Sequence, residues 1–125
     1  MTYHNLNDST VRETVFKKYG GKCAYCGIEL DFNNWNIDHI EPLRRKEYKL
    51  PKGANEISNY NPSCVSCNCS KGVLSIEKWR EAIHHKLVSI NRDSASYRIL
   101  KRYELIEETG RRAVFYFEDY IDLLF

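Results

Sequence analysis

Two pairs of cysteines, Cys23-x-x-Cys26 and Cys64-x-x-Cys67, have the spacing of zinc knuckles. In such a site all four thiolates reach one tetrahedral ion, each at a sulfur-to-metal distance of about 2.3 Å. A shell of four cysteines leaves no open coordination position, so we expect a structural Zn²⁺ that stabilises the fold. Disulfide formation is the alternative, and it is disfavoured for a protein of the cytoplasm. Cys69, the fifth cysteine, is expected to lie outside the metal shell.

The segment NIDHIEP, residues 36–42, lies between the two cysteine pairs and places Asp38 next to His39. A carboxylate is a ligand for hard divalent cations, and a histidine accepts a proton near neutral pH. Taken singly, such a histidine is more often a hydrogen-bonded structural residue, and such an aspartate a turn or cap residue. The position of the pair between the two knuckles favours a catalytic role instead.

Charge is unevenly distributed along the chain, although the net charge is only +2. Residues 42–52 carry five cations against one acid, and residues 104–125 carry six acids against two arginines. The basic segment directly follows the Asp-His pair and is suited to phosphate, whereas the acidic segment repels it. A solvated loop or helix surface is the alternative interpretation of each segment.

Length and composition indicate a single globular domain over residues 1–125. Of the 125 residues 42% are hydrophobic, and no apolar run approaches the length of a membrane span. The core of so short a chain is modest, so a metal site adds usefully to its stability. The N-terminal residues lack the features of a secretory signal, and we therefore expect a cytoplasmic protein without a membrane partner.

Apolar spacing and capping residues predict the elements that position these motifs. A first helix, capped by Asp8 or Ser9, precedes the first knuckle and ends at Gly20 and Gly21. NIDHIEP itself is expected as a strand. The later elements expected are a helix over 75–90, a helix over 94–106 and a strand over 113–118. The apolar stripe expected to face the core is formed by Ile76, Trp79, Ile83, Leu87 and Ile90. The final strand is expected to complete the core, with docking of a protein partner through this C-terminal segment as the alternative.

The stretches CAYCG, NIDHIEPL and NYNPSCVSCNCSKG, in this order, resemble the HNH endonucleases, in the zinc-knuckle subgroup of phages, prokaryotic defence systems and mobile elements. The resemblance covers residues 10–80, and the order and spacing of the motifs make it far more specific than any one motif. It implies an α+β fold with a ββα-metal core, the His-Me finger, around the four-cysteine zinc site. Residues 81–125 would then form a mainly helical C-terminal extension that ends in a strand.

The resemblance also implies catalytic roles. His39 would be the general base that takes a proton from the attacking water, and Asn59 would brace the loop through backbone hydrogen bonds. Asp38 and Asn68 would hold the catalytic divalent ion, and an amide oxygen at position 68 favours Mg²⁺ or Mn²⁺ over zinc or nickel. Neighbouring side chains of a strand point to opposite faces, so Asp38 and His39 reach one phosphate only if the strand bends or bulges.

The implied partner is DNA, and the implied reaction is hydrolysis of its phosphodiester bonds. Arg44, Arg45 and Lys71 would bind phosphates, so backbone contacts would dominate affinity and sequence preference would be weak. Two other functions remain open. One is a non-catalytic zinc-binding module for nucleic acid or protein, which needs no particular residues at positions 38, 39 and 68. The other is a nuclease subunit that is active only with a protein partner.

Overall fold

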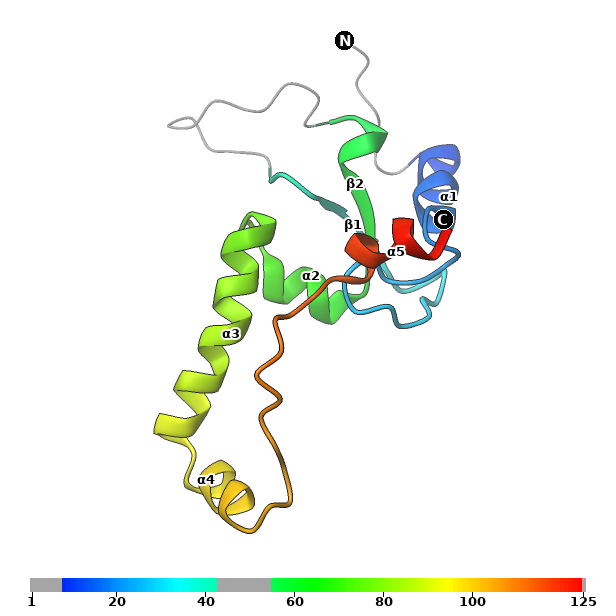
Figure 1. The fold of residues 1–125 in the computed structure, drawn as a ribbon. Helices are drawn as coiled ribbons and strands as arrows, with labels where there is room; N and C mark the ends of the chain where they lie inside the picture. Colours follow the sequence, from blue (N-terminus) through cyan, green and yellow to red (C-terminus); the bar gives the residue numbers. More distant parts are fainter. Residues whose placement is uncertain (1–7, 43–54, 125) are drawn as a thin grey trace, which may run out of the picture. The chain divides into compact units, whose positions relative to one another are not determined.

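The computed structural model describes residues 8–42 and 55–124 (Figure 1). The chain groups into two compact units, one formed by Met1–Ile76 with Val114–Phe125 and the other by Glu77–Ala113. The first unit therefore takes in the C-terminal residues, and the second is inserted between its two parts. The division into a core over 10–80 and an extension over 81–125 stays a prediction. Arg44 and Arg45 lie outside the described residues.

Helix α1, Ser9–Lys17, supplies two buried side chains of the first unit's core. Its N-cap is Asp8, whose Oδ1 accepts hydrogen bonds from the backbone N–H groups of Thr10 (2.9 Å) and Val11 (3.2 Å). Val11 and Val15 face inward and form a cluster with the other buried members, Trp35 and Tyr60. The helix starts where the sequence predicts it, because a short polar side chain is available to satisfy its first N–H groups.

Strands β1, Asn36–His39, and β2, Tyr60–Ser63, form an antiparallel pair. The short 3₁₀ helix η1, Ile57–Asn59, leads into β2, and α1 contacts β2 (Figure 1). The register pairs Asp38 with Asn61 and His39 with Tyr60, and Ile37 with Pro62. A proline is tolerated in β2 because each strand of a two-stranded sheet has one side without a partner strand. The pairing is one-to-one from Asn36 to His39, so the bulge that the sequence led us to consider is not present within this pairing.

Helix α2, Val65–Lys71, follows β2 directly and contacts β1. Its N-cap is Cys64, whose Sγ accepts a hydrogen bond from the backbone N–H of Cys67 (3.3 Å). Gly72, with φ +53°, ends the helix in the left-handed region that favours glycine. Two strands and this helix therefore occur in the order β, β, α and bring both cysteine pairs into one unit.

The prediction of a C-terminal strand was wrong, because residues 116–124 form helix α5, Tyr116–Leu124. Glu118 explains the difference: its Oε1 accepts a hydrogen bond from the backbone N–H of Phe115 (2.8 Å), which caps the start of the helix. Glu118 and Asp119 also place negative charge in the first turn, where the helix dipole favours it. The apolar run over 113–118 was too short for its periodicity to separate strand from helix.

The start of α5 nevertheless packs against the N-terminal part of the first unit, and the core interpretation of this segment expected such packing. The N–H groups of Tyr116 and Phe117 donate to the carbonyl oxygens of Tyr25 (3.0 Å) and Ala24 (2.7 Å). Phe115 is 4% exposed, and its ring and that of Phe117 each meet the Tyr25 ring edge-on, with centroids 5.8 Å apart. Residues far apart in the sequence thus surround the first knuckle.

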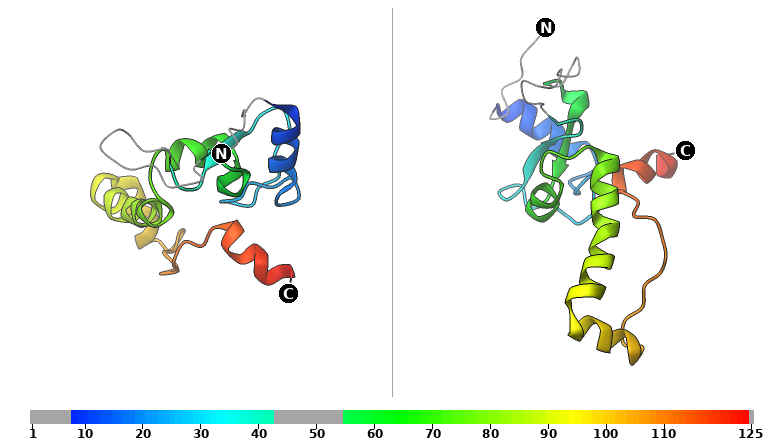
Figure 2. Two further views of the ribbon diagram at one scale, coloured as in Figure 1. Left: turned by 90° about the horizontal axis from the view of Figure 1, so that it is seen from above. Right: turned by 90° about the vertical axis from the view of Figure 1, so that its left-hand side faces the viewer.

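The second unit is a helical pair, α3, Ile76–Asp93, and α4, Ala95–Arg102 (Figure 2). Ser94 caps α4 by accepting a hydrogen bond from the N–H of Tyr97 (3.1 Å). The prediction that the apolar stripe of α3 faces the core was wrong at its C-terminal end, since Leu87 and Ile90 are 39% and 41% exposed. Too few other elements of this unit pack against α3 to cover the whole stripe. None of the helices in the described ranges combines the length and apolar composition that a membrane span requires.

Candidate active site

The four cysteines Cys23, Cys26, Cys64 and Cys67 form one cluster, with all sulfur atoms within 4.8 Å of one another. The first pair lies in a tight turn in which the N–H of Gly27 donates to the carbonyl of Cys23 (3.0 Å). Gly27 has φ +78°, and a Cβ there would lie 3.0 Å from the Tyr116 ring, so this turn needs glycine. The second pair lies at the start of α2.

The donor set of this cluster fits zinc. Tetrahedral coordination at about 2.3 Å places the sulfurs about 3.8 Å apart, and the sulfurs of Cys26 and Cys64 are separated by 3.8 Å. Backbone N–H groups of Tyr25 and Cys64 both donate to Cys23 Sγ at 3.4 Å, which favours a thiolate. A hydrogen bond from Cys67 lowers the pKa of Cys23 to about 4. Cys69 is exposed and outside the cluster.

Asp38 lies on β1 in a buried network of polar groups. Only 5% of the residue is exposed, and its Oδ2 accepts a hydrogen bond from the Tyr25 hydroxyl. The Lys71 Nζ lies 3.1 Å from the same oxygen. Asn61, its cross-strand neighbour, donates from Nδ2 to the Tyr25 hydroxyl oxygen (3.5 Å). Burial raises the pKa of Asp38, while the Tyr25 hydrogen bond and the Lys71 charge oppose that rise.

Lys71 is enclosed by the protein, whereas the sequence predicted that it binds a phosphate. It is 1% exposed, and its Nζ donates to the backbone carbonyl of His39 (2.9 Å) as well as pairing with Asp38. The last turn of α2 lies against β1, so the ammonium group meets the strand and not the solvent. Contact with a phosphate would require this ion pair to break.

His39 follows Asp38 and is half-buried at the end of β1. Its Nε2 lies 3.3 Å from Oδ1 of Asn55, and its ring meets the Tyr60 ring edge-on, with centroids 5.1 Å apart. An imidazole held in this way by one nitrogen retains the other for contact with solvent or substrate.

Asn59 is hydrogen-bonded to the backbone of the two residues that follow His39. Its Nδ2 donates to the carbonyl of Glu41 (3.0 Å), its Oδ1 accepts from the N–H of Glu41 (2.9 Å), and its backbone carbonyl accepts from the N–H of Ile40 (2.9 Å). Asn68 lies on α2, one residue after Cys67 and three before Lys71. The fold thus places Asp38, His39 and Asn59 on or beside the strand pair, and Asn68 on the helix that contacts it.

Residues 23–73, which include the four clustered cysteines and Asp38, His39, Asn59 and Asn68, match the sequence profile of the family described as HNH endonuclease. This segment of the chain belongs to the HNH endonuclease family. Relatives of this chain include YoqL of Bacillus subtilis (strain 168), which carries the name of an SPbeta prophage-derived HNH endonuclease. The two are 36% identical over 101 residues, which cover 78% of this chain and 40% of YoqL.

Among solved structures, the chain is similar to the Type II-C Cas9 enzyme from Actinomyces naeslundii, with a TM-score of 0.51 and 23% identity. The similarity covers 65% of this chain and 8% of the Cas9 chain, and it shows the fold alone. Since the chain spans less than half of either relative, the activities of those whole proteins are not transferred with the match.

Sequence reasoning missed Tyr25, Asn55 and Asn61 as members of the site. Tyr25 lies between two zinc-knuckle cysteines, where an aromatic residue is ordinarily read as part of the zinc shell. Asn55 and Asn61 carry no local signal, since a single asparagine in a polar loop or short strand is common. Only the strand register and the folding of the loop bring these amides to the Asp-His pair.

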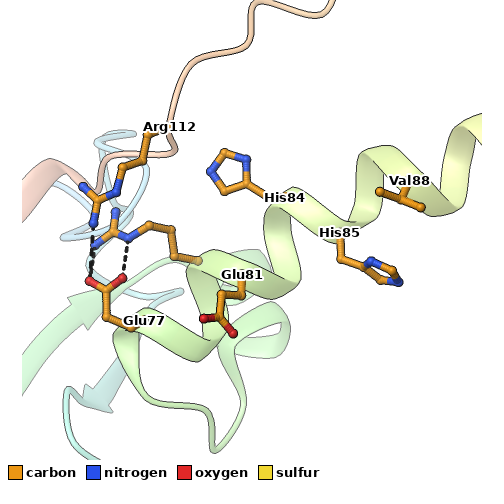
Figure 3. Close-up of a pocket in the computed structure, with 7 residues that line it drawn as sticks. Glu77, Glu81, His84, His85, Val88 and Arg112 are labelled. Carbon is orange, nitrogen blue, oxygen red and sulfur yellow. Dashed lines mark hydrogen bonds and ion pairs between the residues drawn. The ribbon is translucent and has the colours of Figure 1, made fainter.

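The second unit has a groove of its own, lined by Glu77, Arg80, Glu81, His84, His85, Val88 and Arg112 (Figure 3). Arg80 pairs with Glu77 through two contacts of 3.1 Å, and Arg112 reaches the same carboxylate at 3.5 Å. His84 Nε2 accepts a hydrogen bond from the N–H of Ala113 (2.9 Å). Both arginines and His84 therefore have partners within the unit.

Proposed function

We propose that this protein is a metal-dependent DNA endonuclease that hydrolyses phosphodiester bonds by nicking or cutting DNA with low sequence specificity. One observation carries the proposal. Asp38, a buried carboxylate with two protein partners, directly precedes the half-buried His39 on β1, in the same unit as the four-cysteine cluster. A zinc-binding module without catalysis has no need for that pair. We interpret the β1, β2 and α2 elements as a ββα-metal core.

His39 acts as the general base. Imidazole is the side chain best suited to accept a proton from water near neutral pH. The contact of Nε2 with Asn55 orients the ring and directs the other nitrogen, Nδ1, toward the attacking water. Asn59 fixes the position of the backbone after His39 through both of its hydrogen bonds to Glu41.

Asp38 and Asn68 would hold the catalytic divalent ion, which would supply positive charge to the phosphoryl group and to the leaving oxygen. A carboxylate and an amide oxygen are hard ligands, which suits Mg²⁺ or Mn²⁺. β1 carries Asp38 and α2 carries Asn68, and these two elements are in contact. The cysteine cluster, filled by Zn²⁺, holds the start of α2 next to the first knuckle. This fixes the position of Asn68 relative to Asp38.

DNA is bound mainly through its phosphates. Arg44 and Arg45 follow the Asp-His pair in the sequence and are the residues proposed for this contact. Lys71 is not among the proposed phosphate-binding residues, because its ammonium group is buried in an ion pair with Asp38. Binding is expected to weaken with salt and to depend little on sequence.

A supercoiled-plasmid assay tests this function. Wild-type protein should give open-circular or linear product with Mg²⁺ or Mn²⁺ and none with EDTA, and His39→Ala should give none with either metal. His85→Ala is the matched control, since His85 is an exposed histidine of the second unit. Both variants should retain the zinc content of the wild type. Intact plasmid with zinc-loaded wild type at low and moderate salt would refute an autonomous nuclease.

A nuclease that needs a protein partner is the second candidate. In the described residues of the second unit, Trp79 and Arg80 are the buried ones, and several large apolar side chains are exposed. Those more than half exposed are Val88, Tyr103 and Leu105. Exposed apolar side chains of this kind could contribute to an interface if they form one contiguous patch. This candidate predicts that plasmid cleavage appears only when a partner protein is added.

A further inference from the structure

Both protein partners of the Asp38 carboxylate bind the same oxygen atom. The Tyr25 hydroxyl donates to Oδ2, and Lys71 Nζ lies 3.1 Å from Oδ2. Within the part of the chain that the structure describes, no hydrogen bond or ion pair of the side chain involves Oδ1. The two oxygens of one carboxylate are therefore in different surroundings, one bonded twice by the protein and the other left for a ligand from outside.

The two donors come from different elements, which fixes the plane of the carboxylate. A carboxylate rotates easily about its last torsion when a single donor holds it, because that torsion has a broad minimum. Tyr25 approaches from the first knuckle and Lys71 from the last turn of α2. Rotation that exchanges Oδ1 and Oδ2 would break both bonds at once. The side chains of Lys71 and Asp38 are 0% and 6% exposed, so water cannot replace either bond readily.

Each donor is itself held in place. The Tyr25 ring packs at near-right angles against the rings of both Phe115 and Phe117, and its backbone carbonyl accepts a hydrogen bond from the N–H of Tyr116. Lys71 Nζ is also bonded to the carbonyl of His39, which ties the lysine to both members of the catalytic pair. A buried ion pair of this kind adds little net stability, since desolvation of both charges offsets their attraction. Its retention here is better explained by the geometry that it imposes on Asp38.

We infer that Tyr25 and Lys71 are positioning residues that hold Oδ2 of Asp38 and reserve Oδ1 as the single oxygen offered to the divalent ion. This inference rests on the proposed function, because it assigns the ion to Asp38. Neither residue contacts the substrate or the ion. Tyr25 lies within the Cys23-x-x-Cys26 turn, so the structural metal and the catalytic carboxylate are joined through one aromatic side chain.

The test is Tyr25→Phe in the full chain, which removes the hydroxyl and keeps the ring contacts with Phe115 and Phe117. Binding of Mn²⁺ is measured directly, by electron paramagnetic resonance, on zinc-loaded protein without DNA, together with the Mn²⁺ concentration that half-saturates plasmid cleavage. Loss of a hydrogen bond to a metal-ligating carboxylate typically weakens metal binding 10- to 100-fold. We expect Mn²⁺ affinity about tenfold weaker and a matching shift in half-saturation, with zinc content unchanged.

Tyr97→Phe is the matched control, because the Tyr97 hydroxyl also donates to a carboxylate, that of Glu108 (2.9 Å), but in the second unit. It should leave Mn²⁺ affinity unchanged. Lys71→Gln is the second variant and keeps a hydrogen-bond donor without the charge; it too should weaken Mn²⁺ binding at full zinc content.

The outcomes distinguish failure of the positioning role from failure of the proposed function. If wild type cleaves and Tyr25→Phe binds Mn²⁺ within twofold of wild type, the positioning role is overturned and the proposed function stands. If wild type neither binds Mn²⁺ nor cleaves, the proposed function fails and the positioning role fails with it. Weakened binding accompanied by loss of zinc would also overturn the inference, because it would show a structural role for the hydroxyl.

Discussion

Replacement of Asn59 by alanine is expected to loosen the chain directly after His39. The Asn59 side chain bonds both the N–H and the carbonyl of Glu41, at 2.9 and 3.0 Å, and alanine removes both bonds. The backbone bond between the carbonyl of Asn59 and the N–H of Ile40 remains, since alanine retains the carbonyl. The change therefore isolates the contribution of one side chain to the position of His39.

The magnitude follows from the number and exposure of these bonds. An intramolecular hydrogen bond contributes a net 0.5–1.5 kcal/mol, roughly, to the free energy of unfolding. Both bonds lie where water reaches them, so we expect the lower half of that range and a combined loss of about 1–2 kcal/mol. For a chain of this size that corresponds to a decrease in Tm of roughly 3–8 °C.

Thermal unfolding of zinc-loaded protein, followed by circular dichroism, measures this loss. Asn59→Asp keeps an acceptor for the Glu41 N–H and loses the donor, so its Tm should fall between those of wild type and Asn59→Ala. Asn33→Ala, in an exposed turn, is the control and should unfold with the wild type. A Tm for Asn59→Ala within 1 °C of wild type, or an equal decrease for Asn33→Ala, would refute the assignment of a bracing role.

Three further predictions concern the metal, the core and the acid stability of the second unit. Cys64→Ser, or removal of zinc by a strong chelator, should unfold the first unit and abolish its near-ultraviolet circular dichroism, because Cys64 both joins the cluster and caps α2. Val15→Ala should lower the free energy of unfolding in urea by about 2 kcal/mol, since this side chain is fully buried, and an unchanged midpoint would contradict its place in the core. Hydrogen bonds from Asn91, Lys101 and Tyr97 lower the pKa of Glu108 from 4.5 to about 2. Folding thus favours the ionised form, so this contribution to stability is complete above pH 4.5 and is lost as pH falls to about 2. The difference in free energy of unfolding between wild type and Glu108→Gln should therefore be constant above pH 4.5 and should disappear as pH falls to about 2.

Features that depend on neighbouring residues were predictable from the sequence. The knuckle spacing brings each cysteine pair together within four residues, and the structure places all four sulfurs in one cluster. Asp8 is an ordinary N-cap, and β1 forms at the predicted place. In each case the interaction that determines the structure joins residues close in the sequence, so the sequence alone predicts it.

Features that depend on packing between distant segments were not predictable. A lysine at the end of a short helix usually extends into solvent, and only the contact of α2 with β1 turns Lys71 onto Asp38. The run over 113–118 fits either a strand or a helix start, and Glu118 decides between them by capping Phe115. The stripe of α3 has the correct helical spacing, but spacing alone does not say what covers Leu87 and Ile90.

The grouping of Val114–Phe125 with the first unit has a consequence for the timing of folding. During synthesis the two zinc knuckles and the Asp-His pair emerge well before residues 114–117, whose backbone and rings hold Tyr25. The nascent chain can load zinc at that stage, yet Tyr25 gains its lateral support only when the segment beyond the second unit has left the ribosome. The carboxylate of Asp38 is then locked late, after the metal cluster has formed. A ribosome-bound chain stalled before residue 114 should accordingly hold zinc and, under the proposed function, cleave DNA less well than the released protein.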